Sequence, residues 1–315
     1  MTCICCSQIG RKCGSYRNRN RVVQRYFCDR CGVSFSEAQP LNGLRVEFEK
    51  ACQVVNLLCE GMGIRAIERL TGLNRRTVLN ILQEAGERAE RYCEASIHEV
   101  RAENVQADEI HCIVGCRQQT AMEGETERGA MFTFLSIDRD SKLIINWLTG
   151  KRTRENAQEF MRVLRKRLAY DSRFQLTTDN WQIYSGYDGV VRGAFDRGFS
   201  DRVSYATETK YYAKPSEYLP RQVIGVSRRR RFGEPDMRQA TICHMERTNL
   251  SLRLFTKRFA RCTLGYSKTL DNLRYAVALF AWHFNFVRVH SAHGRTPAVA
   301  ARLVDKPMTI AELLG

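Results

Sequence analysis

The spacing of apolar residues divides the chain into three regions. Residues 1–40 are rich in Cys, Arg and Gly and are too few to bury a sizeable core. Residues 44–95 repeat apolar side chains at helical intervals, whereas residues 103–315 alternate strand-like and helix-like segments. We therefore expect a small N-terminal domain over 1–40, a helical domain over 44–95 and a mixed α/β domain over 103–315.

Residues 44–95 have the pattern of a helix-turn-helix. A first helix around Phe48–Leu58 is ended by Gly61 and Gly63, and a second helix covers Ile64–Leu70. Gly72 can take the left-handed conformation of a turn, and Asn74 can cap a third helix, Arg75–Glu84. The apolar positions expected to face inward are Ile67, Leu70, Leu73, Val78, Ile81 and Leu82.

The third helix has an outward face that suits DNA. Its polar positions are Arg75, Arg76, Asn80 and Gln83. These side chains can reach phosphates and base edges in a major groove, so we expect them to bind DNA. The alternative is an ordinary three-helix packing module with a solvated basic face.

The region after residue 103 predicts a sheet in a ribonuclease-H-like order. The expected strands are Val105–Val114, Met131–Ile137, Leu143–Leu148 and Phe174–Thr178, with a helix over Arg154–Leu168 between the third and the fourth. In that order the first and fourth strands are neighbours, so Asp108 and Asp179 would meet at the sheet. Two stretches, Arg117–Gly129 and Tyr211–Asp236, have the composition of loops or insertions.

A later helix, Ile242–Arg258, can supply a third acid. One stripe of this helix is apolar, and the other carries Glu246, Asn249, Arg253 and Lys257. We expect Glu246 to point toward the two aspartates, with Arg253 and Lys257 along a DNA path.

Three other acids compete for a place in the site: Glu109, Asp138 and Asp188. Alternation along a strand should turn Glu109 to the face opposite Asp108. Asp138 is expected at a strand end, paired with an Arg.

Clustered carboxylates suit metal-dependent phosphodiester chemistry. Cleavage needs an activated water and a stabilised leaving oxygen, and two Mg²⁺ ions about 4 Å apart can provide both. Mg²⁺ prefers hard oxygen ligands, so Asp108, Asp179 and Glu246 are the candidate catalytic and metal-binding residues.

The N-terminal cysteines have metal-ligand spacing. Cys3-x-x-Cys6 and Cys28-x-x-Cys31 form two knuckles that can share one tetrahedral Zn²⁺. Cys5 and Cys13 are alternative ligands for the first knuckle, and free thiols in a basic tail are the alternative to zinc. The 13 Cys are odd in number, which suits metal binding in a reducing cytoplasm better than a closed disulfide framework.

The charge balance favours a polyanionic partner. Lys and Arg number 50 against 34 Asp and Glu, which gives a net charge of +16. Nucleic acid is the commonest such partner, ahead of a membrane surface or ribosomal RNA. The sequence has no apolar run of about 18 residues and no secretory signal, so we expect a cytoplasmic, nucleoid-associated protein with no membrane partner.

From about Cys28 to the C-terminus the chain resembles transposases of the insertion-sequence-one family, whose catalytic domain is of the DDE type. The segments that carry the resemblance are Arg65-Ala-Ile-Glu-Arg-Leu-Thr-Gly-Leu73, Asp108-Glu-Ile110, Ser136-Ile-Asp138, Gln175-Leu-Thr-Thr-Asp179, Glu246-Arg-Thr-Asn-Leu250, Gly265-Tyr-Ser-Lys268, His283-Phe-Asn285, Arg288-x-His290 and Thr296-Pro-Ala298. Two positions depart from the family: His111 stands where an aromatic residue, often Trp, is usual, and Asn180 where Gly is common.

The resemblance implies a function. Asp108, Asp179 and Glu246 would be the catalytic acids of a ribonuclease-H-like domain that uses two Mg²⁺ or Mn²⁺ ions. A zinc ribbon and helix-turn-helix would recognise the terminal inverted repeats of an insertion sequence. The enzyme, a homodimer or higher multimer, would nick the ends of double-stranded DNA and join the freed 3′-OH groups to target DNA. A metal-dependent nuclease or resolvase, or a DNA-binding regulator with an inactive nuclease fold, is the alternative.

Overall fold

The computed structural model describes most of the chain. The residues left undescribed are 2, 4, 5, 7, 18–21, 37–40, 42, 43, 45, 200, 201, 214–221 and 262, together with the side chains of 196–199. Among the helices in the described part, none has the length and apolar character that a membrane span requires.

The N-terminal region forms a small antiparallel sheet. Its strands, β1 (Arg11–Arg17), β2 (Val22–Cys28) and β3 (Val33–Ser36), lie in that order. The rings of Tyr26 and Phe35 stack across β2 and β3 with their centroids 5.8 Å apart. This sheet and its cysteines have the form of a zinc ribbon.

Three helices follow, largely where the apolar spacing predicts them. They are α1 (Phe48–Cys59), α2 (Ile64–Thr71) and α3 (Arg75–Ser96). Gly72 ends α2 with a φ of 68°, and the Asn74 side chain accepts a hydrogen bond from the Arg76 amide at the start of α3.

Two details of these helices differ from expectation. The third helix continues well past Glu84, because its second half, with Ala85, Ala89 and Cys93, is also buried. Leu70, expected to face inward, is 61% exposed and does not join Ile67 in the core.

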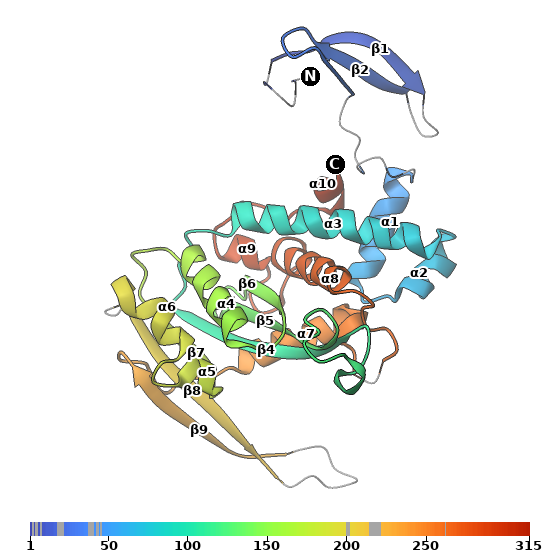
Figure 1. Cartoon of the computed structure of the whole chain (residues 1–315). Helices are drawn as coiled ribbons and strands as arrows, with labels where there is room; N and C mark the ends of the chain where they lie inside the picture. The colour runs from blue at the N-terminus through green and yellow to red at the C-terminus, as the bar shows by residue number, and fades with distance from the viewer. Residues whose placement is uncertain are drawn as a thin grey trace.

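The larger part of the molecule is built around a six-stranded mixed sheet (Figure 1). Its strands are β4 (Asn104–Val114), β5 (Gly129–Asp138), β6 (Ile144–Gly150), β7 (Phe174–Asp179), β8 (Val203–Tyr212) and β9 (Val223–Phe232). They lie in the order β6-β5-β4-β7-β8-β9, with a 3-10 turn, η1 (Gln118–Thr120), between β4 and β5. β4 is antiparallel to β5 but parallel to β7, which is the ribonuclease-H-like arrangement that the sequence predicts.

The stretch Tyr211–Asp236, expected to be a loop or an insertion, contains the end of β8 and the whole of β9 in its described part. β8 and β9 form an antiparallel hairpin that extends away from the rest of the sheet (Figure 1). Its arginine run lies on β9, where Arg228 is paired in register with Glu208 of β8. The Gly and Arg content of β9 resembles that of a loop, but an edge strand tolerates charged side chains because much of it faces solvent.

Helices cover both faces of the sheet. One face packs against α4 (Arg154–Arg167), α5 (Gln182–Ser185) and α6 (Val190–Phe199), and the other against α7 (Cys243–Phe255) and α8 (Leu270–Trp282). The remaining elements are η2 (Lys257–Phe259), a π-helical turn η3 (His283–Val287), α9 (Pro297–Ala300) and α10 (Ile310–Leu314).

The helical region and the sheet region share one core. α3 packs along α8, and a Cβ at Gly86 would lie only 2.7 Å from the Tyr275 Cα, so the close approach of these helices needs glycine there. The buried Asn285 amide exchanges two hydrogen bonds with the backbone of Ile144, which fixes η3 to β6. That contact gives Asn285 a packing role.

Candidate active site

Two of the predicted acids meet where β7 ends. β4 and β7 pair in parallel, with Ala107 opposite Thr178, so the next residues are Asp108 and Asp179. Carboxylate oxygens of Asp108, Asp179 and Glu109 all lie within 4.8 Å of one another. The strand register therefore brings together side chains that are far apart in the sequence.

Glu109 belongs to this cluster, although alternation was expected to take it away. Ala107 and Ile110 do lie in different core clusters, so Asp108 and Glu109 start from opposite faces of β4. The pairing with β7 stops at Ala107, however, and β4 continues without that neighbour. The Glu109 carboxylate can then reach around the strand edge toward Asp179, which the alternation rule does not anticipate.

Burial and mutual repulsion make the cluster electrostatically unfavourable without a cation. Burial, and then the charges of Glu109 and Asp179, hold the pKa of Asp108 well above its usual range. Burial and the charge of Asp179 raise the pKa of Glu109 to about 7. The pKa of Asp179 is also raised, chiefly by burial.

One cation, Arg152, already touches the cluster. Its guanidinium Nε donates to Glu109 Oε1 at 2.5 Å, and another of its nitrogens lies 3.7 Å from Asp179 Oδ2. The guanidinium also stacks over the ring of Trp181, 4.2 Å from the ring centroid. The side chain of Glu109 is 3% exposed, yet its Oε2 has no hydrogen-bond partner, and neither has the nearby buried hydroxyl of Tyr184.

Helix α7 approaches the same acids from the other face of the sheet. The Asn249 side chain donates to Asp108 Oδ2 at 2.9 Å. Glu246 lies one turn earlier on α7, near enough for its charge to raise the pKa of Asp108. Its carboxylate forms an ion pair with Lys210 of β8 and stands outside the cluster of three acids.

The donor set fits divalent metal ions with a preference for oxygen. Three carboxylates at short range offer hard ligands, and a bound cation would stabilise their charged forms against burial and, for Asp108 and Glu109, against the neighbouring charges. Asp108, Glu109 and Asp179 are within mutual reach, and Glu246 lies on the adjoining turn of α7.

The remaining competing acids lie elsewhere. Asp138 accepts hydrogen bonds from the backbone and hydroxyl of Ser141, so it stabilises a turn, and it has no arginine partner among the described residues. Asp188 forms an exposed ion pair with Arg154.

The residues predicted to bind DNA are on the surface to different extents. Arg75, Arg76, Asn80 and Gln83 are all exposed along the first turns of α3. Arg253 is half-buried on α7, one turn beyond Asn249, and Lys257 is exposed in η2.

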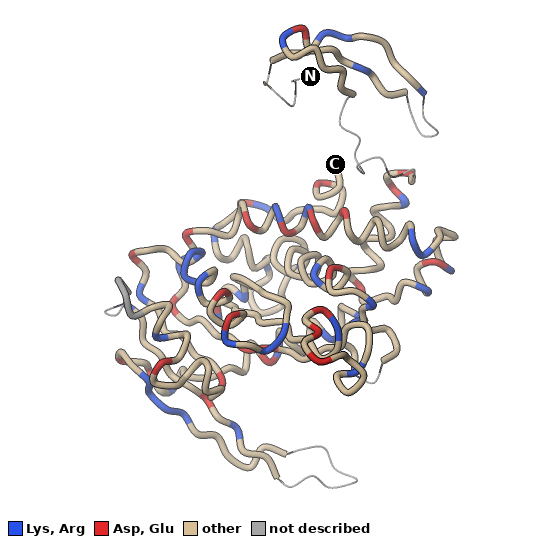
Figure 2. The backbone as a smooth tube through the Cα atoms, viewed as in Figure 1, with Lys and Arg blue, Asp and Glu red and all other residues tan. Residues whose placement is uncertain are grey.

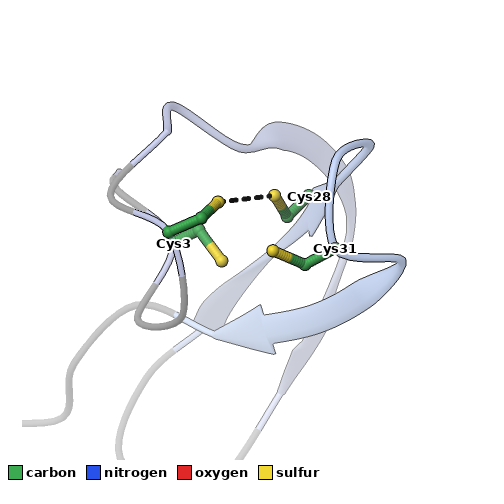
Figure 3. Close-up of side chains that lie close together, drawn as sticks. Cys3, Cys28 and Cys31 are labelled. Atoms are coloured by element: carbon green, nitrogen blue, oxygen red, sulfur yellow. Dashed lines mark hydrogen bonds between the residues drawn. The ribbon is translucent and has the colours of Figure 1, made fainter.

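A second cluster consists of cysteines. The sulfurs of Cys3, Cys6, Cys28 and Cys31 lie within 4.8 Å of one another, and those of Cys6 and Cys28 are 3.6 Å apart. Figure 3 shows the labelled side chains pointing toward a common centre. Of the two alternative ligands, Cys13 is in β1 outside the cluster, and Cys5 lies outside the described residues. Four thiol groups at this range match a tetrahedral metal site.

Three residues at the site, Glu109, Arg152 and Lys210, were not predicted to belong to it. Of these, Arg152 carries a signal that could have been used, because it lies just after β6 ends at Gly150, and its guanidinium reaches the acids. Lys210 reaches Glu246 from a segment 36 residues away, and no local pattern identifies that contact.

No family model matches the chain, and no curated protein matches it. Among solved structures it is similar to the piggyBac transposase in a synaptic complex with hairpin DNA, at 11% identity over 85% of this chain and 68% of that chain, with a TM-score of 0.45. It is also similar to a chain of the simian T-cell lymphotropic virus intasome in complex with the PP2A regulatory subunit B56 gamma (15% identity, 82% and 77% of the two chains, TM-score 0.39).

A third similar structure is the Mos1 mariner paired-end complex with Mn (11% identity, 76% and 78% of the two chains, TM-score 0.25). All three TM-scores are low, and a shared fold does not decide activity. The residues of the site itself therefore have to indicate the function.

Proposed function

We propose that the chain is a DNA transposase of the DDE type, similar to the insertion-sequence-one family, that cleaves the ends of a mobile element and joins them to target DNA. The observation that supports this most directly is the convergence of Asp108, Asp179 and Glu109 at the end of β7, beside helix α7. Fold similarity adds nothing to this inference, which depends on the acids and on the motifs that carry the family resemblance.

Under this proposal Asp108 and Asp179 hold divalent metal ions, and Glu246 is the third acid. Two Mg²⁺ or Mn²⁺ ions bound there would supply an activated nucleophile and a stabilised leaving oxygen. Asn249 orients the Asp108 carboxylate through its hydrogen bond, and Lys210 holds Glu246 on the adjoining turn. Glu109 is the alternative third acid, since it is already within reach of both aspartates.

The proposal extends to the N-terminal half of the chain. Cys3, Cys6, Cys28 and Cys31 bind one structural Zn²⁺, while Arg75, Arg76, Asn80 and Gln83 of α3 contact double-stranded DNA at the inverted repeats. A dimer or higher multimer brings two DNA ends together, in the cytoplasm of a bacterium. Zinc content measured on purified protein tests the metal: Cys28→Ser with Cys31→Ser should lose it, and Cys13→Ser should keep it.

A strand-transfer assay tests the catalytic function. Pre-cut DNA ends, taken from the sequences that flank the gene, are incubated with the full-length protein, Mg²⁺ and a target plasmid. We expect joined products from the wild type and none from Asp179→Asn, which should still bind the ends. Asp188→Asn is the matched control, because that nearby acid pairs only with Arg154 among the described residues and should leave joining unchanged.

Each other outcome identifies an alternative. Nicks without joined products would indicate a nuclease or resolvase. DNA binding without cleavage would indicate a regulator. An Asp179→Asn variant that still joins DNA would remove this cluster from the active site.

A further inference from the structure

A groove opens at the C-terminal half of β4, beside the acids. Its volume is ≈ 720 Å³. Its lining comes from β4, from the turn that follows β4, from α7 and η2, and from the segment after η2. The residues that matter here are Arg117, Arg253, Arg258, Arg261, Leu264 and Tyr266. We refer to it as the arginine groove.

The arginine groove carries positive charge without acidic compensation. Arg117, Arg253, Arg258 and Arg261 line it, and no Asp or Glu does. Among the described residues none of these four arginines forms an ion pair. Burial, and then the charge of Arg261, lowers the pKa of Arg253. An anion in the groove would relieve this repulsion.

Arg258 is the clearest case of an uncompensated charge. It is only 9% exposed, and its Nε donates to the hydroxyl of Ser267 at 2.8 Å. A hydroxyl does not neutralise a guanidinium, and burial lowers the pKa of Arg258 to about 10. A buried cation normally has an anionic partner. We therefore expect an anion from outside the protein to bind beside Arg258.

Apolar and aromatic side chains lie among these cations. Leu264 is 91% exposed, although it is a large apolar residue. The ring of Tyr266 also lines the groove, and the Lys268 ammonium lies 3.5 Å from the centroid of that ring. Cations interleaved with exposed flat or apolar side chains are typical of surfaces that bind single-stranded nucleic acid, where phosphates and unstacked bases are held together.

The position of the groove connects it with the candidate active site. Along one side of α7 follow Glu246, then Asn249, which donates to Asp108, and then Arg253, which lines the groove. Arg253 and Asp108 are close enough for their charges to interact. A strand with one phosphate at the acids would therefore continue directly into the groove.

We propose that the arginine groove binds an unpaired stretch of the DNA strand next to the phosphate that is cut, with its phosphates on the arginines and a base against Leu264 and Tyr266. This inference rests on the proposed function in taking DNA as the substrate. An acidic peptide would pair with the arginines but would place no planar base against Leu264 and Tyr266. A nucleotide strand can do both, because its phosphates pair with the arginines and its bases contact these two side chains.

Photo-crosslinking locates the strand without any need for catalysis. A single-stranded oligonucleotide of about eight nucleotides, carrying 5-iododeoxyuridine, is irradiated with the full-length protein in metal-free buffer, and the crosslinked peptides are identified by mass spectrometry. We expect crosslinks within residues 253–266, above all at Tyr266. The same oligonucleotide annealed to its complement should give far fewer crosslinks at these residues.

Matched variants test the arginines. Arg253→Gln with Arg261→Gln should reduce crosslinking in the groove by about tenfold. Arg173→Gln should leave it unchanged, because Arg173 is exposed at the opposite end of β7 from Asp179. Crosslinks confined to residues 1–95, or equal crosslinking of single strand and duplex, would overturn the inference.

The outcome is separable from that of the strand-transfer assay. Crosslinks in the groove without joining activity would support strand binding by the groove and would contradict the transposase function. Joining activity with crosslinks only elsewhere would do the reverse.

Discussion

The guanidinium of Arg152 lies between Glu109 and Asp179, with the ring of Trp181 beside it. It is the cation that partly neutralises the acids in the free protein. A divalent ion that binds these acids competes with it for the same carboxylates, since a carboxylate oxygen engaged by an arginine is less available to a metal.

Replacing Arg152 should therefore strengthen metal binding. We expect Arg152→Gln to bind Mn²⁺ more tightly than the wild type, by about fivefold, because a partly exposed ion pair contributes on the order of 1 kcal/mol. Isothermal titration calorimetry on the full-length protein without DNA measures this. Arg154→Gln is the control, because Arg154 pairs with Asp188 outside the cluster. Weaker Mn²⁺ binding by Arg152→Gln would mean that Arg152 positions the acids and does not compete for them.

Individual residues also show how far the sequence could predict the site. Asp108 and Asp179 were predictable because each has a fixed position on a strand and the two strands are neighbours. The place of Glu109 in the site was not predictable, because the alternation rule assumes that β7 pairs with β4 along its whole length. The partner of Glu246, Lys210, depends on the packing of β8 against α7, which local spacing does not encode.

At the scale of elements, one buried carboxylate links the β8–β9 hairpin to the start of α7, in addition to the pairing of β8 with β7. Glu208 of β8 is 2% exposed, and it accepts hydrogen bonds from Arg228 of β9 and from Thr241 and the Ile242 amide, just before α7. Glu208 therefore joins both strands of the hairpin to the start of α7, the helix that carries Glu246.

The loss of Arg228 should destabilise the fold. Arg228→Ala leaves the buried Glu208 without its cation, and we expect the free energy of unfolding to fall by about 3 kcal/mol. Chemical denaturation measures the difference. The control is Arg229→Ala, because Arg229 is exposed and has no ion pair among the described residues. Its free energy of unfolding should change by no more than about 0.5 kcal/mol. Equal effects of the two variants would show that Glu208 does not depend on Arg228.

Elements differed in how well spacing predicted them. The strands and helices around the acids have clear periodicity, and the structure has them within a few residues of the expected bounds. β9 was missed because its polarity is that of a loop, and the full length of α3 was missed because its second half is buried by α8, a contact distant in sequence.

At the scale of the whole molecule, the net charge of +16 is spread widely. Figure 2 shows Lys and Arg in the N-terminal sheet, in the helices and on the β8–β9 hairpin alike. A molecule of this kind would contact DNA phosphates through several regions at once, and each contact releases condensed counterions.

Binding to DNA should therefore weaken steeply with salt. Between about 50 and 200 mM salt we expect the Kd for a duplex to rise at least about 100-fold, measured by fluorescence anisotropy without metal. A nearly constant Kd would argue against phosphates as the main contact.

The position of β9 at the end of the sheet has one more consequence. The outer edge of β9 has no partner among the described strands. An unpaired edge strand can form hydrogen bonds with the edge strand of another molecule, which leads to aggregation. Two copies that met along β9 would bring their rows of four arginines side by side, and like charges in facing rows repel. We expect the arginines of β9 that have no acidic partner to oppose such pairing, so protein stored at high salt, where the repulsion is screened, should aggregate more readily.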